Sequence, residues 1–260
     1  MSGRLPWMAG LIGAVVALVA FAPARWLAEP VGAATQGQLQ LVNAQGTVWN
    51  GRADVLVSGG EGSRDRATLP QGVRWRLAPT LVRGWPAASL AVSLPCCSPA
   101  PVAMRITARP GTSELIVDRF SSRWPAALLA GLGTPWNTLR LEGALELNSP
   151  GFTLKRDSGR LQLDGSVVVD AVDMASRLST LRPLGSYRAT LQAAPDGNTA
   201  TLNLQTVRGE LLLQGEGLWI GGRLRFSGDA RAAAGREEPL SNLLNIVGRR
   251  QGDRSIITLG

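Results

Sequence analysis

The sequence predicts a mainly β protein: one N-terminal transmembrane helix, then one curved, largely antiparallel sheet domain with a few short helices. We expect the sheet to form an open half-barrel or to fold over on itself. Three observations support this class. A single long apolar run lies near the start, apolar and polar residues alternate from about Gln36 onward, and turn formers are frequent, with 31 glycines and 16 prolines in 260 residues.

The apolar run covers residues 5–24 and contains no charged side chain. About 20 helical residues rise about 30 Å, the thickness of the hydrocarbon core of a bilayer. Trp7 and Trp26 flank the run, as expected for aromatic residues at the two membrane interfaces. The resulting division of the chain is a tail at 1–4, a transmembrane anchor at 5–26, a linker at 27–35 and an exported β-rich domain at 36–260.

A cleaved signal peptide is the alternative for the same segment. Ala20-Phe21-Ala22 has the small residues that a cleavage site needs, and Ala22-Pro23-Ala24 is a weaker candidate. Cleavage after Ala22 would place Pro23 directly after the cut, where proline is poorly tolerated. An uncleaved anchor is therefore favoured, and in both cases the rest of the chain is exported.

Period-two patterns in the rest of the chain predict half-buried strands. They occur at 73–77, 139–147, 161–169, 202–205, 211–213 and 224–226. Glycine, proline and asparagine turns separate them at 59–60, 149–151, 195–198 and 221–222. Such strands form an antiparallel sheet with one polar face, whose apolar face is either a filled core or a groove for a lipid-like ligand.

Three short helices are expected, at 125–130, 174–181 and 239–247. In the third, Leu240, Leu243, Leu244 and Val247 fall on one helical face. The segment 256–259 then reads as a terminal strand.

Residue types exclude most catalytic and metal chemistry. Histidine is absent, which removes Ser-His-Asp and Cys-His mechanisms and most zinc sites. The two cysteines, Cys96 and Cys97, are adjacent, so they form a vicinal disulfide, pair between molecules, or remain two free thiols in a proline-rich loop. We expect no catalytic site, no metal and no cofactor; a hydrolase that uses only carboxylates is the remaining enzymatic alternative.

The chain is basic, with a net charge of +8 and a single lysine among its 27 basic residues. That charge would attract lipid headgroups or acidic protein faces, although the arginine usage also fits a GC-rich genome. Nucleic acid is not expected as a partner, because the arginines are scattered and no nucleic-acid-binding motif is present.

Eight residues are candidates for partner contact, three of them tryptophans beside turns and five of them arginines near the C-terminus. They are Trp49, Trp136, Trp219, Arg223, Arg225, Arg249, Arg250 and Arg254. The tryptophans could equally pack as core over glycine turns, and the arginines could lie in a solvated turn.

Several segments, in this order, resemble one known family, the type II secretion system protein N of Gram-negative bacteria. They are GTVWNG (46–51), TPWN (134–137), PLGSY (183–187), WIGGRLRF (219–226) and LLNIVGRRQGD (243–253). The resemblance covers the whole chain. It implies a single-pass inner-membrane protein with a non-catalytic periplasmic domain that contacts other subunits of the secretion machine. It also hints at curved β-sheet proteins of envelope lipid traffic, which makes a lipid- or hydrophobe-binding module the alternative function.

Overall fold

The computed structural model describes residues 4–60, 62–220 and 223–260. Fifteen strands occur in this part of the chain. They are β1 (Leu39–Gly46), β2 (Asn50–Ser58), β3 (Arg66–Thr68), β4 (Val73–Val82), β5 (Trp85–Ser93), β6 (Val102–Arg109), β7 (Thr112–Pro125), β8 (Leu141–Asp157), β9 (Arg160–Ser176), β10 (Gly185–Ala193), β11 (Thr199–Gly209), β12 (Leu211–Ile220), β13 (Arg223–Ala232), β14 (Arg249–Gln251) and β15 (Arg254–Leu259).

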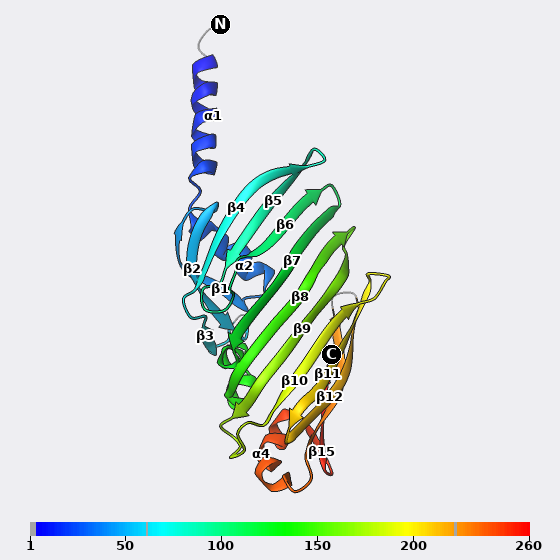
Figure 1. The fold of residues 1–260 in the computed structure, drawn as a ribbon. Helices are drawn as coiled ribbons and strands as arrows, with labels where there is room; N and C mark the ends of the chain where they lie inside the picture. Colours follow the sequence, from blue (N-terminus) through cyan, green and yellow to red (C-terminus); the bar gives the residue numbers. More distant parts are fainter. Residues whose placement is uncertain (1–3, 61, 221–222) are drawn as a thin grey trace.

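All of these strands belong to one antiparallel sheet in the order β1-β2-β4-β5-β6-β7-β8-β9-β10-β11-β12-β13-β15-β14, with β3 paired to β2. The sheet is not closed, because β1 and β14 lie at its two edges (Figure 1). The predicted mainly β, antiparallel class is confirmed, and the choice left by the sequence is settled in favour of an open sheet. The turn predicted at 221–222 lies outside the described residues.

Six helical segments accompany the sheet in the described part. They are α1 (Arg4–Ala20), η1 (Ala24–Leu27), α2 (Ala28–Ala34), η2 (Ala126–Leu132), α3 (Trp136–Leu139) and α4 (Glu237–Val247), of which η1 and η2 are 3-10 helices. Within the described ranges, no helix reaches the length and apolarity needed to cross a membrane.

The structure differs from the anchor expected at 5–26, because α1 already ends at Ala20. Pro23 has no amide hydrogen to continue the helix and instead forms an isolated β-bridge with Thr47. The stretch 27–35, expected as a linker, consists mostly of α2.

Two of the three short helices are confirmed. The segment 125–130 forms most of η2, and 239–247 lies within α4. The helix expected at 174–181 is wrong, since β9 continues to Ser176 through pairing of Met174 with Gly185 and of Ser176 with Leu141. The strand expected from Leu139 begins only at Leu141, because α3 and a left-handed Arg140 precede it.

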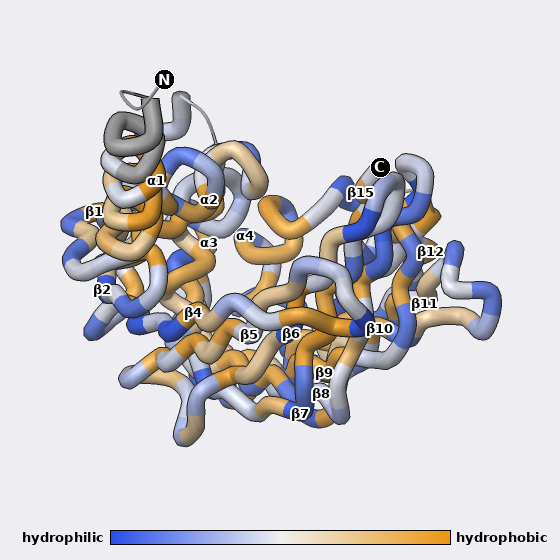
Figure 2. Tube along the Cα trace, turned by 90° about the horizontal axis from the view of Figure 1, so that it is seen from above, coloured by the Kyte–Doolittle hydropathy of each residue, from blue (hydrophilic) through white to orange (hydrophobic). Residues whose placement is uncertain are grey.

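The sheet curves strongly, and α3 and α4 lie inside the curve (Figure 2). β-bulges interrupt the pairing of β8 with β9 near Gly143 and between Asn148 and Gly151. Such bulges bend and twist a strand, and the positive φ angles of Gly143 and Gly151 are ones that glycine adopts without strain.

The hairpin topology gives the molecule two distinct ends. The turns β1–β2, β4–β5, β6–β7, β8–β9 and β10–β11 all lie along the side of the sheet that carries α1, which we call the α1 end, and from β4–β5 to β10–β11 they step progressively away from α1 (Figure 1). The connections that contain η2, α3 and α4 lie at the opposite end, which we call the α4 end.

Candidate functional site

At the α4 end, helices cover the concave face of the sheet. Leu240, Leu243 and Leu244 of α4 are at most 1% exposed and pack on Leu211 and Ala230 of β12 and β13. Since α4 presents one apolar face at helical spacing, it fills the curve of the sheet as a hydrophobic core.

Buried polar groups in this covered region have partners. The Tyr187 hydroxyl donates to the Leu211 carbonyl oxygen at 3.0 Å, and the Ser255 hydroxyl donates to the Leu244 carbonyl oxygen at 2.6 Å. Burial raises the pKa of the Tyr187 phenol well above its ordinary value, so the phenol stays protonated and serves as a donor.

Three arginines at the α4 end form ion pairs. Glu142 accepts from Arg177 at 3.3 Å and from Arg182 at 2.8 Å, and the hydrogen bond from Arg177, followed by that from Arg182, lowers the pKa of the Glu142 carboxyl. Arg236 and Glu210 form a further ion pair at 3.4 Å. At this end, helices therefore cover the concave face, and carboxylates hold Arg177, Arg182 and Arg236.

Toward the α1 end, the same concave face carries a row of apolar side chains that no helix covers. The row runs through directly paired residues on four strands: Ile106, Leu115, Leu154 and Leu163. Ile106 is 39% exposed, the other three are half-buried, and none belongs to the hydrophobic clusters found among the described residues. We call this region, together with its continuation on β10–β13, the open trough.

The residues next to this row along each strand point to the convex face, and they are polar. The neighbouring row there consists of Thr107, Glu114, Lys155 and Gln162. The period-two alternation therefore places an apolar surface inside the curve and a solvated surface outside it.

Trp219 and Phe226 continue the open trough on β12 and β13. Trp219 pairs with Ala200 and Leu224 on its two sides and is half-buried. A Cβ atom at Gly215 would lie 2.4 Å from the Phe226 ring, so this glycine makes room for the ring. Trp219 is thus a wall of the trough.

The segment 46–51 lies at the junction between α1 and the sheet. The Trp49 indole donates to the Val19 carbonyl oxygen at 2.8 Å, which satisfies one of the free carbonyls at the end of α1. The Trp75 indole donates to the Val48 carbonyl oxygen at 2.9 Å, and Trp75 packs with buried Ala24. Trp49 therefore fixes the helix to the first hairpin.

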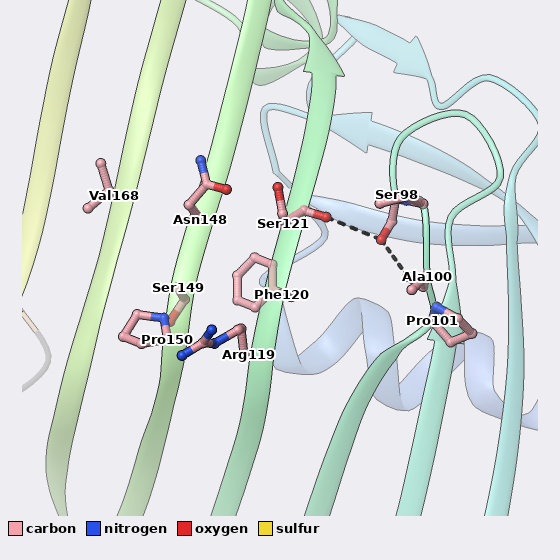
Figure 3. Close-up of a pocket in the computed structure, with 11 residues that line it drawn as sticks. Ser98, Ala100, Pro101, Arg119, Phe120, Ser121, Asn148, Ser149, Pro150 and Val168 are labelled. Carbon is pink, nitrogen blue, oxygen red and sulfur yellow. Dashed lines mark hydrogen bonds between the residues drawn. The ribbon is translucent and has the colours of Figure 1, made fainter.

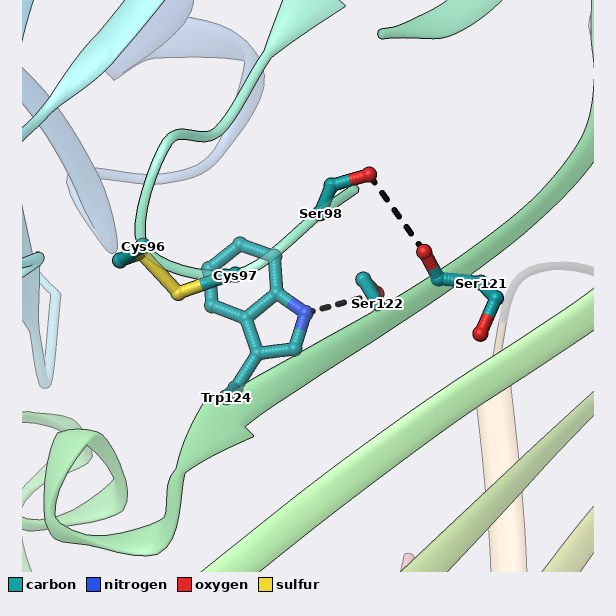
Figure 4. The surroundings of a disulfide bond; sticks show 6 residues. All are labelled: Cys96, Cys97, Ser98, Ser121, Ser122 and Trp124. Atoms are coloured by element: carbon teal, nitrogen blue, oxygen red, sulfur yellow. Dashed lines mark hydrogen bonds between the residues drawn. A yellow bond between two sulfur atoms is a disulfide. The ribbon is translucent and has the colours of Figure 1, made fainter. Parts of the chain in front are cut away.

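The two cysteines form a disulfide with each other (Figure 4). Cys97 is buried against Leu69 and Leu128, with Trp124 beside them. The Cys97 carbonyl oxygen accepts from the Arg123 amide at 2.6 Å, so the loop is tied to β7 where β6 and β7 no longer pair. From the sequence this disulfide was one of three alternatives, beside pairing between molecules and two free thiols.

A cleft of about 470 Å³ lies beside this loop (Figure 3). The loop 98–101 forms one side, and Phe120, Asn148 and Val168, on three neighbouring strands, lie along the cleft. The loop is held to β7 by the Ser98 hydroxyl, which is 3.4 Å from the Ser121 carbonyl oxygen. The cleft is shallow and carries few charges, with Arg119 its only ionisable lining residue in the described part.

The eight predicted contact residues do not form one patch. Arg223 and Arg225 lie on the convex face of β13, and Arg249 and Arg254 share that face on β14 and β15. Arg250 pairs with Ser255 on the other face.

The three predicted tryptophans lie in three different places. Trp136 is 37% exposed at the start of α3. Trp49 lies at the junction of α1 with the sheet, and Trp219 lines the open trough.

Sequence reasoning missed the open trough at β6 and β7. The signal was present in the alternation of Val102, Met104 and Ile106 with small or charged residues. What the alternation could not indicate was which part of the apolar face the helices leave uncovered. In the described ranges, no group of three or more Cys, Asp or Glu residues is arranged to bind a metal ion.

One family model matches this chain. The family model "Type II secretion system (T2SS), protein N" matches residues 7–257, nearly the whole chain. No curated protein sequence and no solved structure matches the chain. A match of this extent shows that the chain belongs to the type II secretion system protein N family.

Proposed function

We propose that this protein is a non-catalytic accessory component of the type II secretion machinery, anchored in the inner membrane by α1. In this proposal the β domain lies in the periplasm and contacts other subunits during export of folded proteins across the outer membrane. The family match over 7–257 is the observation that carries the proposal.

The surface of α1 supports the anchoring role. Leu11, Ile12 and Val16 each expose 60% or more of their surface, and Val15, Leu18 and Val19 are also exposed. A helix that is apolar all round requires an apolar environment. Its 17 residues rise about 25 Å, at the lower limit of membrane-spanning helices.

The C-terminal edge of the sheet is the proposed contact surface. Arg249 and Arg254 lie on the convex face near Arg231, which pairs directly with Arg254, and Arg223 and Arg225 extend the same face along β13. Acidic side chains near them in the described residues include Glu216, Asp229 and Asp253, and Arg254 approaches Asp253 only at 3.8 Å. Arginine on a sheet edge fits an acidic partner segment.

Two experiments test this function. Deletion of the gene should leave normally secreted enzymes in the periplasm, measured by fractionation, and the wild-type chain should restore secretion. A photoreactive amino acid at position 249 should cross-link to another secretion subunit in cells, whereas the same residue at exposed Arg64, on a loop at the α4 end, should not. Unchanged secretion in the deletion strain, together with no subunit captured from position 249, would contradict the proposal.

A second candidate function is binding of a lipid or another hydrophobe. The open trough favours it, because a continuous apolar row on four strands remains uncovered in a basic, membrane-attached protein. Concave, mostly apolar surfaces are the usual sites for such ligands.

Matched substitutions on the two faces of the sheet distinguish lipid bound in the open trough from lipid bound around α1. Ile106, 39% exposed, faces the trough, and Leu218, 40% exposed, faces outward on β12. Native mass spectrometry of the full chain with added phosphatidylethanolamine should show bound lipid that Ile106→Glu removes and Leu218→Glu keeps. Equal lipid occupancy in wild type and both variants would contradict a role for the trough.

A further inference from the structure

We infer that the hairpin tips at the α1 end form a docking surface for the anionic surface of a lipid bilayer. The inference goes beyond the secretion function and rests in part on the proposed insertion of α1. The surface, which we call the membrane rim, is defined by Leu81, Arg83, Trp85, Arg109, Arg156 and Arg160.

Topology brings these residues together on one end. The antiparallel order places the tips 81–85, 109–112 and 155–161 on the same side of the sheet, and Figure 1 shows the β4–β5 tip nearest α1 with the β6–β7 and β8–β9 tips stepping progressively away from it. Asn50, which follows the turn joined to α1, pairs with Arg76, and Val82 lies six residues further along β4. The tip therefore projects about 20 Å beyond the junction along the strand direction. Figure 1 places it at about the height of the last turn of α1.

The charge of the membrane rim fits an anionic surface. Its three tips contain Arg83, Arg109, Lys155, Arg156 and Arg160 against a single acid, Asp157. Asp157 lies 3.8 Å from Lys155, and the four arginines form no ion pair within the described part of the chain. The fourth tip adds Asp196, whose carboxylate accepts from the amides of Asn198 and Thr199. Basic residues within a Debye length of anionic lipids are attracted to them.

Apolar side chains occur at the same tips. Leu81 is 71% exposed and Trp85 is 42% exposed on either side of Arg83. Tryptophan is enriched at membrane interfaces, where its ring lies among the headgroups. At the α4 end, by contrast, Arg177, Arg182 and Arg236 are all paired with carboxylates. At the β4–β5 tip, Arg83, which forms no ion pair in the described residues, therefore lies between exposed Leu81 and Trp85 at the end that α1 would hold against the membrane.

Hydrogen–deuterium exchange of the full chain in nanodiscs tests the inference. We expect the amides of 80–87 and 108–113 to exchange more slowly in discs that contain phosphatidylglycerol than in pure phosphatidylcholine. Each arginine near an anionic surface contributes about fivefold to the bound population. Arg83→Glu should therefore reduce the protection of 80–87 by about fivefold or more, and Arg64→Glu at the α4 end should leave it unchanged.

The amides of α1 separate this inference from the anchoring proposal. Protected α1 amides with equal exchange of the tips in both disc types would overturn the membrane rim and leave the anchor standing. Protected tips with freely exchanging α1 amides would support the rim and contradict the anchor. Free exchange in both regions would overturn both.

Discussion

The two ends of the concave face have the same strands and the same alternation, yet only one end is covered. At the α4 end, Leu240, Leu243 and Leu244 fill the curve and are at most 1% exposed. At the α1 end, Ile106 and its paired neighbours line an open trough. The comparison teaches that the buried core and the uncovered apolar surface are separated along the strands, since the covered half supplies the core.

Truncation of a buried leucine should have the largest effect on stability. Leu244→Ala removes a fully buried side chain from α4, so we expect the free energy of unfolding in urea to fall by about 2–5 kcal/mol. Leu202→Ala, on the half-buried trough face of β11, is the matched control and should cost about half of that or less. Equal losses for the two variants would contradict the division into a covered half and an open half.

The junction of α1 with the sheet should be the next most sensitive point. A Cβ atom at Gly51 would lie 2.4 Å from the Trp75 ring and 2.9 Å from two backbone oxygens. Gly51→Ala should therefore lower the free energy of unfolding by about 1–3 kcal/mol. At Gly32 of α2 an added Cβ meets nothing within 4 Å, so Gly32→Ala should not destabilise the protein in the same unfolding assay.

Tyr187→Phe removes one buried hydrogen bond from the covered half. Loss of the bond to Leu211 should cost about 1 kcal/mol in the same assay. Because burial raises the pKa of Tyr187, its contribution is complete below the ordinary tyrosine pKa of about 10 and falls as pH rises above it. The stability difference between wild type and Tyr187→Phe should therefore shrink above pH about 10; a constant difference across that range would contradict this assignment.

Charge placed in the open trough should have the smallest effect on stability. Ile106→Glu and Leu218→Glu change side chains of nearly equal exposure on opposite faces, so each should alter the free energy of unfolding by under about 1 kcal/mol. Binding of a hydrophobic fluorescent dye should nevertheless be weaker in Ile106→Glu than in the wild type, and unchanged in Leu218→Glu. A large destabilisation by Ile106→Glu would show that the trough is part of the core.

Local patterns made much of this architecture predictable. Period-two alternation at 202–205 and 224–226 identified β11 and β13, and the apolar face of 239–247 identified α4. The single open sheet was one of two expected forms. These features depend on residues close together in sequence, which is why a pattern could indicate them.

Features that depend on distant pairing were not predictable. Met174 continues β9 because it pairs with Gly185, although its local sequence favoured a helix. The end of α1 is fixed by Val48 and Trp49, which bind carbonyl oxygens of Ala22 and Val19 some thirty residues earlier. For Trp49 the sequence therefore left partner contact and packing over a glycine turn as alternatives, and its bond to α1 became visible only with the fold.

Photo-cross-linking in cells at positions 106 and 218 tests most directly whether the open trough is a binding surface. It tests the second candidate function, in which the uncovered half of the concave face holds a ligand. A photoreactive amino acid at Ile106 should give a discrete adduct, identified by mass spectrometry as lipid or protein, and the equally exposed Leu218 should give none. Equal adduct yields at the two positions, or none at Ile106, would contradict the claim.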